Sequence, residues 1–183
     1  MVRIMDRRQR KTRAAIFEAF ISLLSESRYS RITVGQIIDR ADVGRATFYA
    51  HFETKDDLLK ALCEELFDHV LGKKSSDTPI FDCEAPGSVF LHLFQHLQKN
   101  DNHILDLLSS RNEDLFVRYF KDALKRLAQK ELSLFDSRKP PDLPEDFWVD
   151  HIASTFVETV RWWLEHDRSL PPEQMVEYFY MAV

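Results

Sequence analysis

The stretch DVGRATFYAHF, residues 42–52, decides how the N-terminal part of the chain folds. Phe48 and Phe52 are four residues apart, so on a helix they share one face and anchor it on a core. The other faces carry Arg45, Ala46, Thr47, Tyr49 and Ala50. This spacing predicts a short helix over residues 45–51 with one buried face and one face that meets a partner.

The residues before this stretch carry an unusually complete signal for the start of another short helix. Thr33 is a preferred N-cap residue, and Gln36 stands three positions later, as a capping box requires. Ile32 and Ile37 occupy the two positions of a hydrophobic staple. Two short helices joined by a tight turn form a helix-turn-helix, whose second helix enters the DNA major groove.

Helical periodicity continues on both sides of this motif. Apolar residues at spacings of three and four predict an amphipathic helix over residues 8–26, and Thr54 caps a helix that reaches about residue 71. Further helices are expected at about 88–98, 102–109, 112–135, 145–167 and 172–183, with an exposed loop at 72–88 and a proline break at 136–144. The chain has only four glycines, which disfavours hairpin-rich folds. The predicted fold is all-α, with a three-helix head, a helical body and about nine helices.

The net charge of −5 conceals an asymmetry along the chain. Residues 1–60 contain 12 Lys+Arg and 8 Asp+Glu, whereas residues 61–183 contain 13 and 22. A basic head on an acidic body indicates that only the head meets a polyanion.

The exposed residues of the 45–51 helix suit contacts with DNA. Arg45 can donate two hydrogen bonds to a guanine edge, and Thr47 can contact a base, a thymine methyl or a phosphate. Ala46 is small enough to let the helix sit deep in the groove. Tyr49, His51 and Lys55 are suited to contact phosphate oxygens. Phosphate contacts set the register of the helix on the duplex but do not distinguish one base sequence from another.

The longer segment ITVGQIIDRADVGRATFYAHFETKDDLL, residues 32–59, resembles the DNA-binding domain of the TetR family of bacterial transcriptional regulators. The similarity covers about residues 8–60. It implies an all-α homodimer with a DNA-binding domain, residues 1–54, and a ligand-binding and dimerisation domain, residues 55–183. The segments VETVRWWLEH and LPPEQMVEYFYMAV are similar to one short-bodied subgroup of that family.

The resemblance implies a double-stranded, palindromic operator as the partner of the head. Its contacts would come from Thr33, Arg45, Ala46, Thr47, Tyr49, His51 and Lys55. The basic arm Arg7, Arg8, Arg10, Lys11 and Arg13 either adds DNA contacts or is a solvated tail. Two positions depart from the family pattern, because Asp42 stands where glycine is common and Gly44 stands where serine is common.

The family resemblance further implies a repressor that a small hydrophobic or aromatic effector releases from DNA, and the lack of a signal-peptide core predicts that it is cytoplasmic. The effector would occupy an apolar cavity between the helices of the body, whose aromatic residues either form the core or line that cavity. One alternative is an activator or architectural factor controlled by a protein partner. Another is a helical enzyme with a DNA-binding head, but the chain has no glycine-rich phosphate loop and no evident nucleophile–base pair. We therefore expect no enzyme activity and no cofactor.

The helix at 145–167 carries two apolar stripes. One contains Trp148, Ile152, Thr155, Phe156, Thr159 and Trp163, and the other contains Val149, Ala153, Val157, Val160 and Leu164. Two stripes need two partners, so the second stripe is expected to face a second subunit, with the 172–183 helix completing the interface. The alternative is a central helix buried all round in a monomer.

Other features predict ordinary roles. No apolar run approaches the roughly 20 residues of a membrane span, and the N-terminus lacks a signal-peptide core. Cys63 and Cys83 are expected to be inert thiols. His92 and His96 have a chelating spacing, and His69, His103 and His151 could lie near them. No acidic or thiol partner stands at a telling distance, so we expect no metal site.

Overall fold

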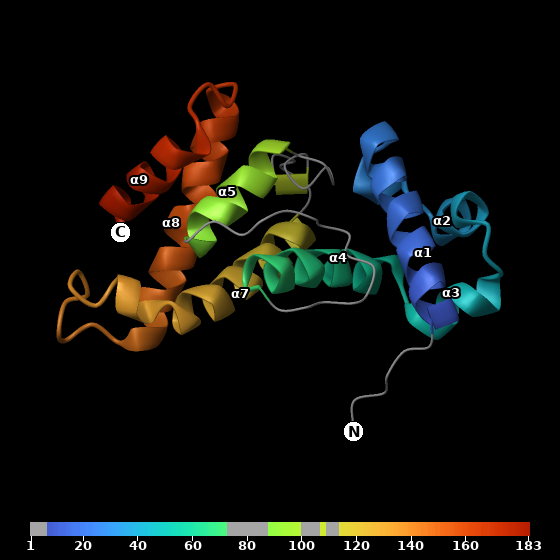
Figure 1. Cartoon of the computed structure of the whole chain (residues 1–183), viewed down its shortest axis with the longest axis horizontal. Coiled ribbons are helices and arrows are strands. Elements are labelled where there is room, and N and C mark those ends of the chain that lie inside the picture. The colour runs from blue at the N-terminus through green and yellow to red at the C-terminus, as the bar shows by residue number, and fades with distance from the viewer. Residues whose placement is uncertain (1–6, 73–87, 100–106, 109–113) are drawn as a thin grey trace. The chain divides into compact units, whose positions relative to one another are not determined.

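The computed structural model describes residues 7–72, 88–99, 107–108 and 114–183 (Figure 1). Within these ranges every regular element is helical, with eight α-helices and two short 3₁₀ helices. This confirms the all-α prediction. The contacts divide the chain into two compact units, Met1–Glu84 and Ala85–Val183. The functional boundary expected between residues 54 and 55 stays a prediction.

The first unit contains the four helices of the head and its connection. They are α1 (Arg7–Glu26), the 3₁₀ helix η1 (Tyr29–Arg31), α2 (Val34–Ala41), α3 (Arg45–His51) and α4 (Lys55–Val70). Each α-helix begins within one or two residues of the position predicted from sequence, whereas η1 was not predicted. The reason is local, because periodicity and capping residues near each boundary specify it.

The first unit is held together by aromatic and aliphatic side chains on the inner faces of these helices. The Phe17 and Phe52 rings meet edge to face with centroids 5.5 Å apart, and Phe20 meets Tyr29 at 6.2 Å. Phe48 is fully buried. Each such side chain contributes about 1.5–3 kcal/mol by burial, so α3 is fixed to the core through its two phenylalanines.

The second unit contains four long helices. They are α5 (Val89–Lys99), α7 (Asp114–Lys130), α8 (Glu145–Glu165) and α9 (Pro172–Ala182), with the 3₁₀ helix η2 (Leu132–Leu134) after α7. Of the helix expected at 102–109, only Leu107 and Leu108 are described, and both are helical. The expected loop at 72–88 lies almost wholly outside the described residues. The prediction that one helix runs to residue 135 is wrong, because the chain tightens into a 3₁₀ turn after Lys130.

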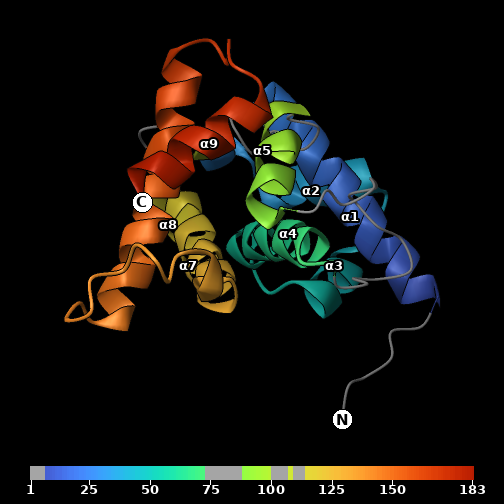
Figure 2. The same ribbon diagram turned by 60° about the vertical axis from the view of Figure 1, so that its left-hand side comes forward.

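The core of the second unit is aromatic. α9 lies against both α5 and α8 (Figure 2), and at their junction the Phe90 and Phe179 rings are 4.9 Å apart. Phe94 lies 4.7 Å from Phe156 and 5.8 Å from Trp163, centroid to centroid. The aromatic residues that sequence left open between core and cavity wall are all buried: Phe90, Phe94, Phe116, Phe120 and Trp148. They are core residues in this structure.

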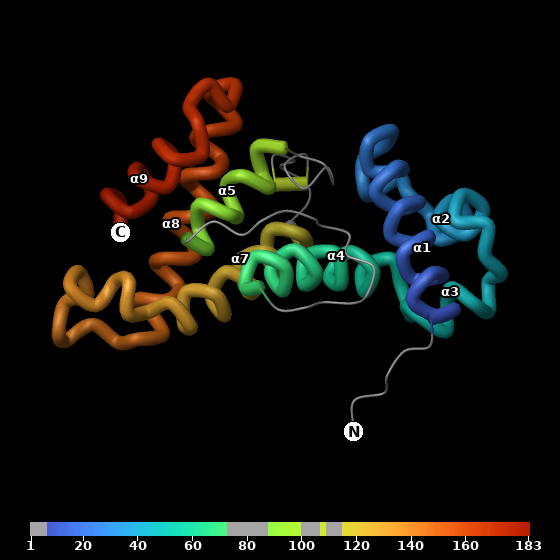
Figure 3. The backbone as a smooth tube through the Cα atoms, viewed as in Figure 1, coloured from blue at the N-terminus to red at the C-terminus, as the bar shows by residue number. Residues whose placement is uncertain are grey.

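A tight turn connects α8 to α9 (Figure 3). Asp167 and Arg168 both adopt left-handed backbone angles, with φ of 55° and 52°. The turn is closed by the Arg168 amide, which donates to the Trp163 carbonyl at 3.0 Å, and by the Trp163 indole N–H, which donates to the Leu170 carbonyl at 2.9 Å. Pro172 then opens α9 at its first turn, as its fixed φ favours.

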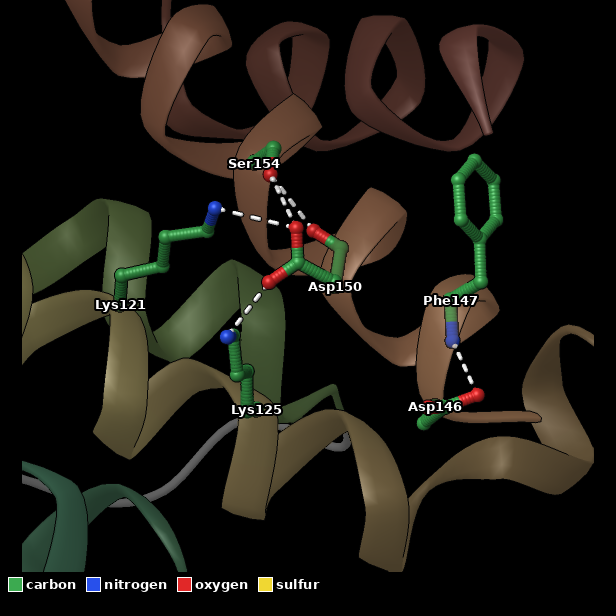
Figure 4. Close-up of polar contacts among 6 residues, drawn as sticks. All are labelled: Lys121, Lys125, Asp146, Phe147, Asp150 and Ser154. Carbon is green, nitrogen blue, oxygen red and sulfur yellow. Dashed lines mark hydrogen bonds and ion pairs between the residues drawn. The ribbon is translucent and has the colours of Figure 1, made fainter. Parts of the chain in front are cut away.

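An ion-pair cluster joins α7 to α8 (Figure 4). The Asp150 carboxylate lies 2.5 Å from the Lys125 ammonium and 3.2 Å from the Lys121 ammonium. The hydrogen bond from Lys125, followed by that from Lys121, lowers the pKa of Asp150. Because these side chains are partly exposed, solvent screens the pairs and each adds at most about 1 kcal/mol.

Candidate DNA-binding surface

The capping box predicted for α2 is present. The Gln36 amide donates to Thr33 Oγ1 at 3.2 Å, and the Thr33 amide donates to Gln36 Oε1 at 2.8 Å. The staple residues Ile32 and Ile37 are both buried. These contacts satisfy amide groups that the first turn of a helix leaves without helical partners. The start of α2 is therefore fixed by its own sequence.

Gly35 lies inside α2 and weakens it. A Cβ at this position would meet only Thr33 Oγ1, at 3.8 Å, which is ordinary van der Waals contact. Gly35→Ala is expected to stabilise the chain by about 0.5–1 kcal/mol, because alanine loses less backbone entropy in a helix than glycine does. Chemical denaturation followed by circular dichroism measures this change. A destabilised variant would show that the start of α2 is more crowded than the structure indicates.

The turn between α2 and α3 adopts the geometry expected from its residues. Asp42 has φ 50° and ψ 49°, the left-handed conformation that aspartate tolerates better than most residues. The Val43 amide donates to the Ile38 carbonyl at 3.2 Å. Gly44 is the N-cap of α3 and offers no side-chain cap. Asp42, in place of the glycine common in the family, therefore keeps the turn intact. Gly44, in place of the common serine, lacks the hydroxyl that would cap α3.

α3 has one buried and one exposed face, as the sequence predicts. Phe48 and Phe52 are 0% and 4% exposed. Four of the residues expected to meet DNA bases or phosphates lie on the exposed side, together with Ala50: Arg45, Ala46, Thr47 and Tyr49. Tyr49 is 47% exposed, although a large aromatic side chain gains free energy by burial. An exposed tyrosine beside an exposed arginine and threonine is typical of a surface that binds a polar partner.

Lys55, the first residue of α4, is tied to η1. Its ammonium donates to the backbone carbonyls of Tyr29 and Ile32, each at 3.0 Å, and lies 4.3 Å from the centre of the Tyr29 ring. The Tyr29 hydroxyl in turn donates to the Asp56 carboxylate. Two of the three ammonium donors are thus used inside the protein, so a phosphate contact from Lys55 would use the third. Sequence reasoning missed this positioning role.

Lys55→Ala is expected to lower the free energy of unfolding of the first unit by about 1–2 kcal/mol, because two charge-assisted hydrogen bonds are lost. Lys60→Ala is the matched control on the same helix. Lys60 is half exposed, and within the described residues its one ion pair is the i,i+4 pair with Glu64 at 3.9 Å, so its loss should cost less than about 0.5 kcal/mol. Equal denaturation midpoints for the two variants would contradict the positioning role.

His51 closes α3 and is half-buried. Burial, followed by the positive charge of Arg13, lowers the pKa of His51 below its ordinary value. The imidazole is therefore mainly neutral at pH 7 in the free protein. It can donate one hydrogen bond to a phosphate in that form, and a nearby phosphate would favour its protonated form.

Arg13, one residue of the expected basic arm, makes contacts inside the first unit instead. The Arg13 guanidinium hydrogen-bonds the Glu65 carboxylate at 3.3 Å and lies 4.9 Å from the Phe17 ring and 5.0 Å from the Phe52 ring. It braces α1 against α4 and against the end of α3. Arg7, Arg8 and Lys11 are exposed on the first turns of α1, where they stay candidates for contacts with DNA.

A second surface feature lies between α8 and α9. A groove of about 410 Å³ is lined by Ser154, Thr155, Glu158, Thr159, Trp162, Met175, Tyr178 and Ala182. The hydroxyls of Ser154 and Thr159 donate to carbonyls of their own helix, so these residues offer mainly apolar atoms to the groove. Trp162 and Tyr178 are 41% and 39% exposed, and their rings meet edge to face with centroids 6.2 Å apart.

The prediction that the second apolar stripe of α8 faces a second subunit is wrong. Val149, Ala153, Val157 and Val160 are buried inside the protomer, and Leu164 is only partly exposed. α7 and α9 both pack on α8, so two helices of the same protomer cover its apolar stripes. The open face of α8 is the one that lines the groove. The sequence prediction also placed Thr155 and Thr159 on the first stripe, with the core residues Trp148 and Trp163. That placement is wrong for the two threonines, because both line the groove and are only partly buried.

Family models match both parts of the chain. The model for bacterial regulatory proteins of the tetR family matches residues 14–62, and the model for a transcriptional regulator C-terminal region matches residues 84–183. Both describe transcriptional regulators, not enzymes. The first match contains the whole of α2, the turn and α3, and the second contains α5 to α9.

Individual relatives agree with these matches. The HTH-type transcriptional regulator YxbF of Bacillus subtilis (strain 168) is 38% identical over 71 residues, or 36% of this chain and 19% of that protein. TtgR of Pseudomonas putida, also an HTH-type transcriptional regulator, is 25% identical over 145 residues, or 76% of this chain and 66% of that protein. The chain thus spans about a fifth to about two thirds of the length of these relatives.

Solved structures resemble the whole chain. The crystal structure of a TetR transcriptional regulator from Streptococcus agalactiae 2603V has a TM-score of 0.71 and 36% identity, over 95% of this chain and 94% of that one. The dihydroxyacetone kinase operon activator DhaS shares the fold, with a TM-score of 0.61 and 20% identity over 93% and 94% of the two chains.

Within the described ranges no helix combines the length and apolar character that a bilayer crossing requires. The helix-turn-helix, the family matches to both parts of the chain and the full-length structural similarity at 36% identity agree with one another. The chain belongs to the TetR family of bacterial transcriptional regulators, whose members bind DNA through such a motif and form dimers.

Proposed function

We propose that this regulator is a repressor that reads a palindromic operator with the exposed face of α3 and leaves DNA when a small molecule binds its body. The observation that carries the DNA-reading part is the division of α3 into two faces. Phe48 and Phe52 hold the helix on the core, while Arg45, Thr47 and Tyr49 stay exposed on its outer side. Such a helix can enter the major groove without disturbing the fold.

The side chains of this surface divide the work by their chemistry. Arg45 reads a guanine through two hydrogen bonds, and Thr47 contacts a neighbouring base. Ala46 keeps the helix surface low enough for close approach. Tyr49 and His51 bind phosphate oxygens and so set the register of α3 on the duplex.

Two further residues contact the backbone of DNA from the edges of the motif. Thr33 is exposed at the start of α2, where free amides and the helix dipole favour a phosphate. Lys55 uses its third N–H donor for the same purpose, beside the two that hold η1. Both residues thus combine a structural role with a contact to DNA.

The groove face of α8 and α9 forms the homodimer interface. Its residues Trp162 and Tyr178 are exposed in the protomer, and Met181, the neighbour of the groove residue Ala182 on α9, is 77% exposed. Aromatic residues and methionine are enriched at the buried centres of protein interfaces. A second copy of this face covers the groove and sets two α3 helices one DNA turn apart, about 34 Å, or somewhat more.

A small hydrophobic or aromatic effector releases the repressor by favouring a conformer whose heads no longer match the groove spacing. Part of the segment expected to enclose the effector, residues 100–106 and 109–113, lies outside the described residues. The alternative is an activator or architectural factor controlled by a protein partner. DhaS is an operon activator with this fold, but at 20% identity the similarity supports the fold alone.

Titrating a panel of small apolar and aromatic metabolites against the protein–operator complex separates these possibilities. An effector should weaken operator binding at least tenfold at saturation while leaving the dimer intact. If no compound changes the affinity, and a co-purifying protein does, the activator or architectural alternative is correct. Fluorescence anisotropy with labelled operator, at fixed salt, measures both outcomes.

Operator binding is expected to strengthen as pH falls from about 8 to about 6. The pKa of His51 is lowered in the free protein and rises beside a phosphate, so the complex takes up a proton. The affinity should increase by up to about tenfold per pH unit for each protomer. Over the same range the free protein should lose some stability, because its unfolded chain accepts that proton first. His51→Gln should flatten the pH dependence of binding, and an unchanged slope would remove His51 from the contacts.

A further inference from the structure

α5 presents two histidines that face each other. His92 and His96 are one helical turn apart, and their Nε2 atoms are 3.1 Å from one another. Their ring centroids are 4.8 Å apart. His92 is 1% exposed and is the one polar side chain among the buried residues of the described ranges. A histidine placed this deep, with its ring nitrogen directed at a second histidine, is an unusual use of core volume.

The separation of the two nitrogens fits a shared metal ion. Zinc–imidazole bonds measure about 2.0–2.1 Å in tetrahedral sites, which places two ligand nitrogens roughly 3.3–3.4 Å apart. The observed 3.1 Å is within a few tenths of that value, and small changes in the side-chain torsions close the difference. The i,i+4 spacing on one helix supplies both ligands without any movement of the backbone.

We propose that His92 and His96 bind one divalent transition-metal ion per chain. Two imidazole nitrogens select zinc, nickel, copper or cobalt over magnesium and calcium, which prefer oxygen ligands. Of the positions around the ion, these residues fill two, and water or other donors fill the rest. The sequence argument against a metal site was the lack of an acidic or thiol partner at a telling distance. The geometry of the two facing rings outweighs that argument, because the pair forms a bidentate ligand on one helix.

The competing explanation is a simple hydrogen bond, in which one imidazole donates N–H to the other. Both explanations place the rings in contact, but only one predicts stoichiometric metal uptake. Neither explanation involves α3, so a test of the metal site is independent of a test of the proposed DNA binding.

The test is a titration of the untagged full-length protein, stripped with a chelator, with Co²⁺ and Zn²⁺ in competition with a chromogenic chelator. We expect one equivalent of metal per chain, tetrahedral Co²⁺ absorption bands, and a rise in Tm with Zn²⁺. His96→Gln, chosen because His96 is only half-buried, should lower the affinity more than about 100-fold, since losing a residue that merely hydrogen-bonds a metal ligand already costs about 10–100-fold. Circular dichroism shows whether this variant keeps its fold.

The matched control is His166→Gln. His166 is exposed at the end of α8, where it stacks on Trp162, and its loss should leave metal affinity unchanged. If the wild-type chain takes up no Co²⁺ at 100-fold molar excess, the pair is a hydrogen bond and the proposal fails. It also fails if folded His96→Gln binds metal as tightly as the wild type does.

Discussion

Trp162→Glu is expected to separate the dimer into folded monomers. The substitution places a carboxylate at the centre of the α8–α9 groove face, where a second copy would bury it without a partner. An uncompensated buried charge costs about 3–5 kcal/mol, so the dimer dissociation constant should rise at least about 100-fold. Trp162 is 41% exposed in the protomer, and the monomer therefore tolerates the change.

Analytical ultracentrifugation across nanomolar to micromolar concentrations measures this effect. Phe147→Glu is the control, because Phe147 is 61% exposed on α8 and does not line the groove. It should leave the dimer unchanged. The same substitution at Val160 would be uninformative, because Val160 is fully buried in the protomer and a charge there would unfold the chain. A Trp162→Glu protein that remains dimeric would move the interface away from this face.

Arg45→Ala is expected to weaken operator binding by about 1–3 kcal/mol for each half-site, which is about fivefold to about 150-fold in dissociation constant for each. Arg45 is exposed on α3 with no ion-pair partner among the described contacts, and it lies beside Ala46 and Thr47, which are exposed too. Loss of a bidentate contact to guanine should also relax discrimination at that base pair. Binding to random DNA should fall less, because phosphate contacts dominate it.

Lys60→Ala removes one positive charge from the same unit without touching α3, and it separates base reading from simple electrostatics. It should lower operator and random-sequence binding by similar, small factors. Arg45→Ala should instead change the ratio between them. If both substitutions change the two affinities equally, Arg45 contacts a phosphate rather than a base. Anisotropy titrations with operator and scrambled duplexes at matched salt measure the ratio.

The DNA-binding motif was predictable from sequence because its determinants are close together along the chain. Thr33 and Gln36 are three residues apart and form the capping box, while Phe48 and Phe52 are four apart and share the buried face. Asp42 lies in the turn and takes its left-handed angles with no distant partner. Local sequence thus specified both helices and the face that α3 exposes.

The roles that sequence missed depend on contacts between distant residues. Lys55 bonds carbonyls 23 and 26 residues away, and Arg13 pairs with Glu65 across 52 residues. Both looked like exposed cations, since nothing near them in the chain reveals their partners. For α8 the difficulty was different, because apolar residues lie on most of its circumference. Only the packing of α7 and α9 decides which face stays open.

The central claim is that the exposed face of α3 reads base edges in the major groove. Selection of duplexes from a random pool by the wild-type dimer, followed by guanine N7 methylation interference on the winners, tests it most directly. The account predicts an inverted repeat, with interfering guanines in two major-groove clusters about one helical turn apart, or somewhat more. Failure to enrich any sequence, or enrichment of duplexes that tolerate methylation at every guanine N7, would contradict it.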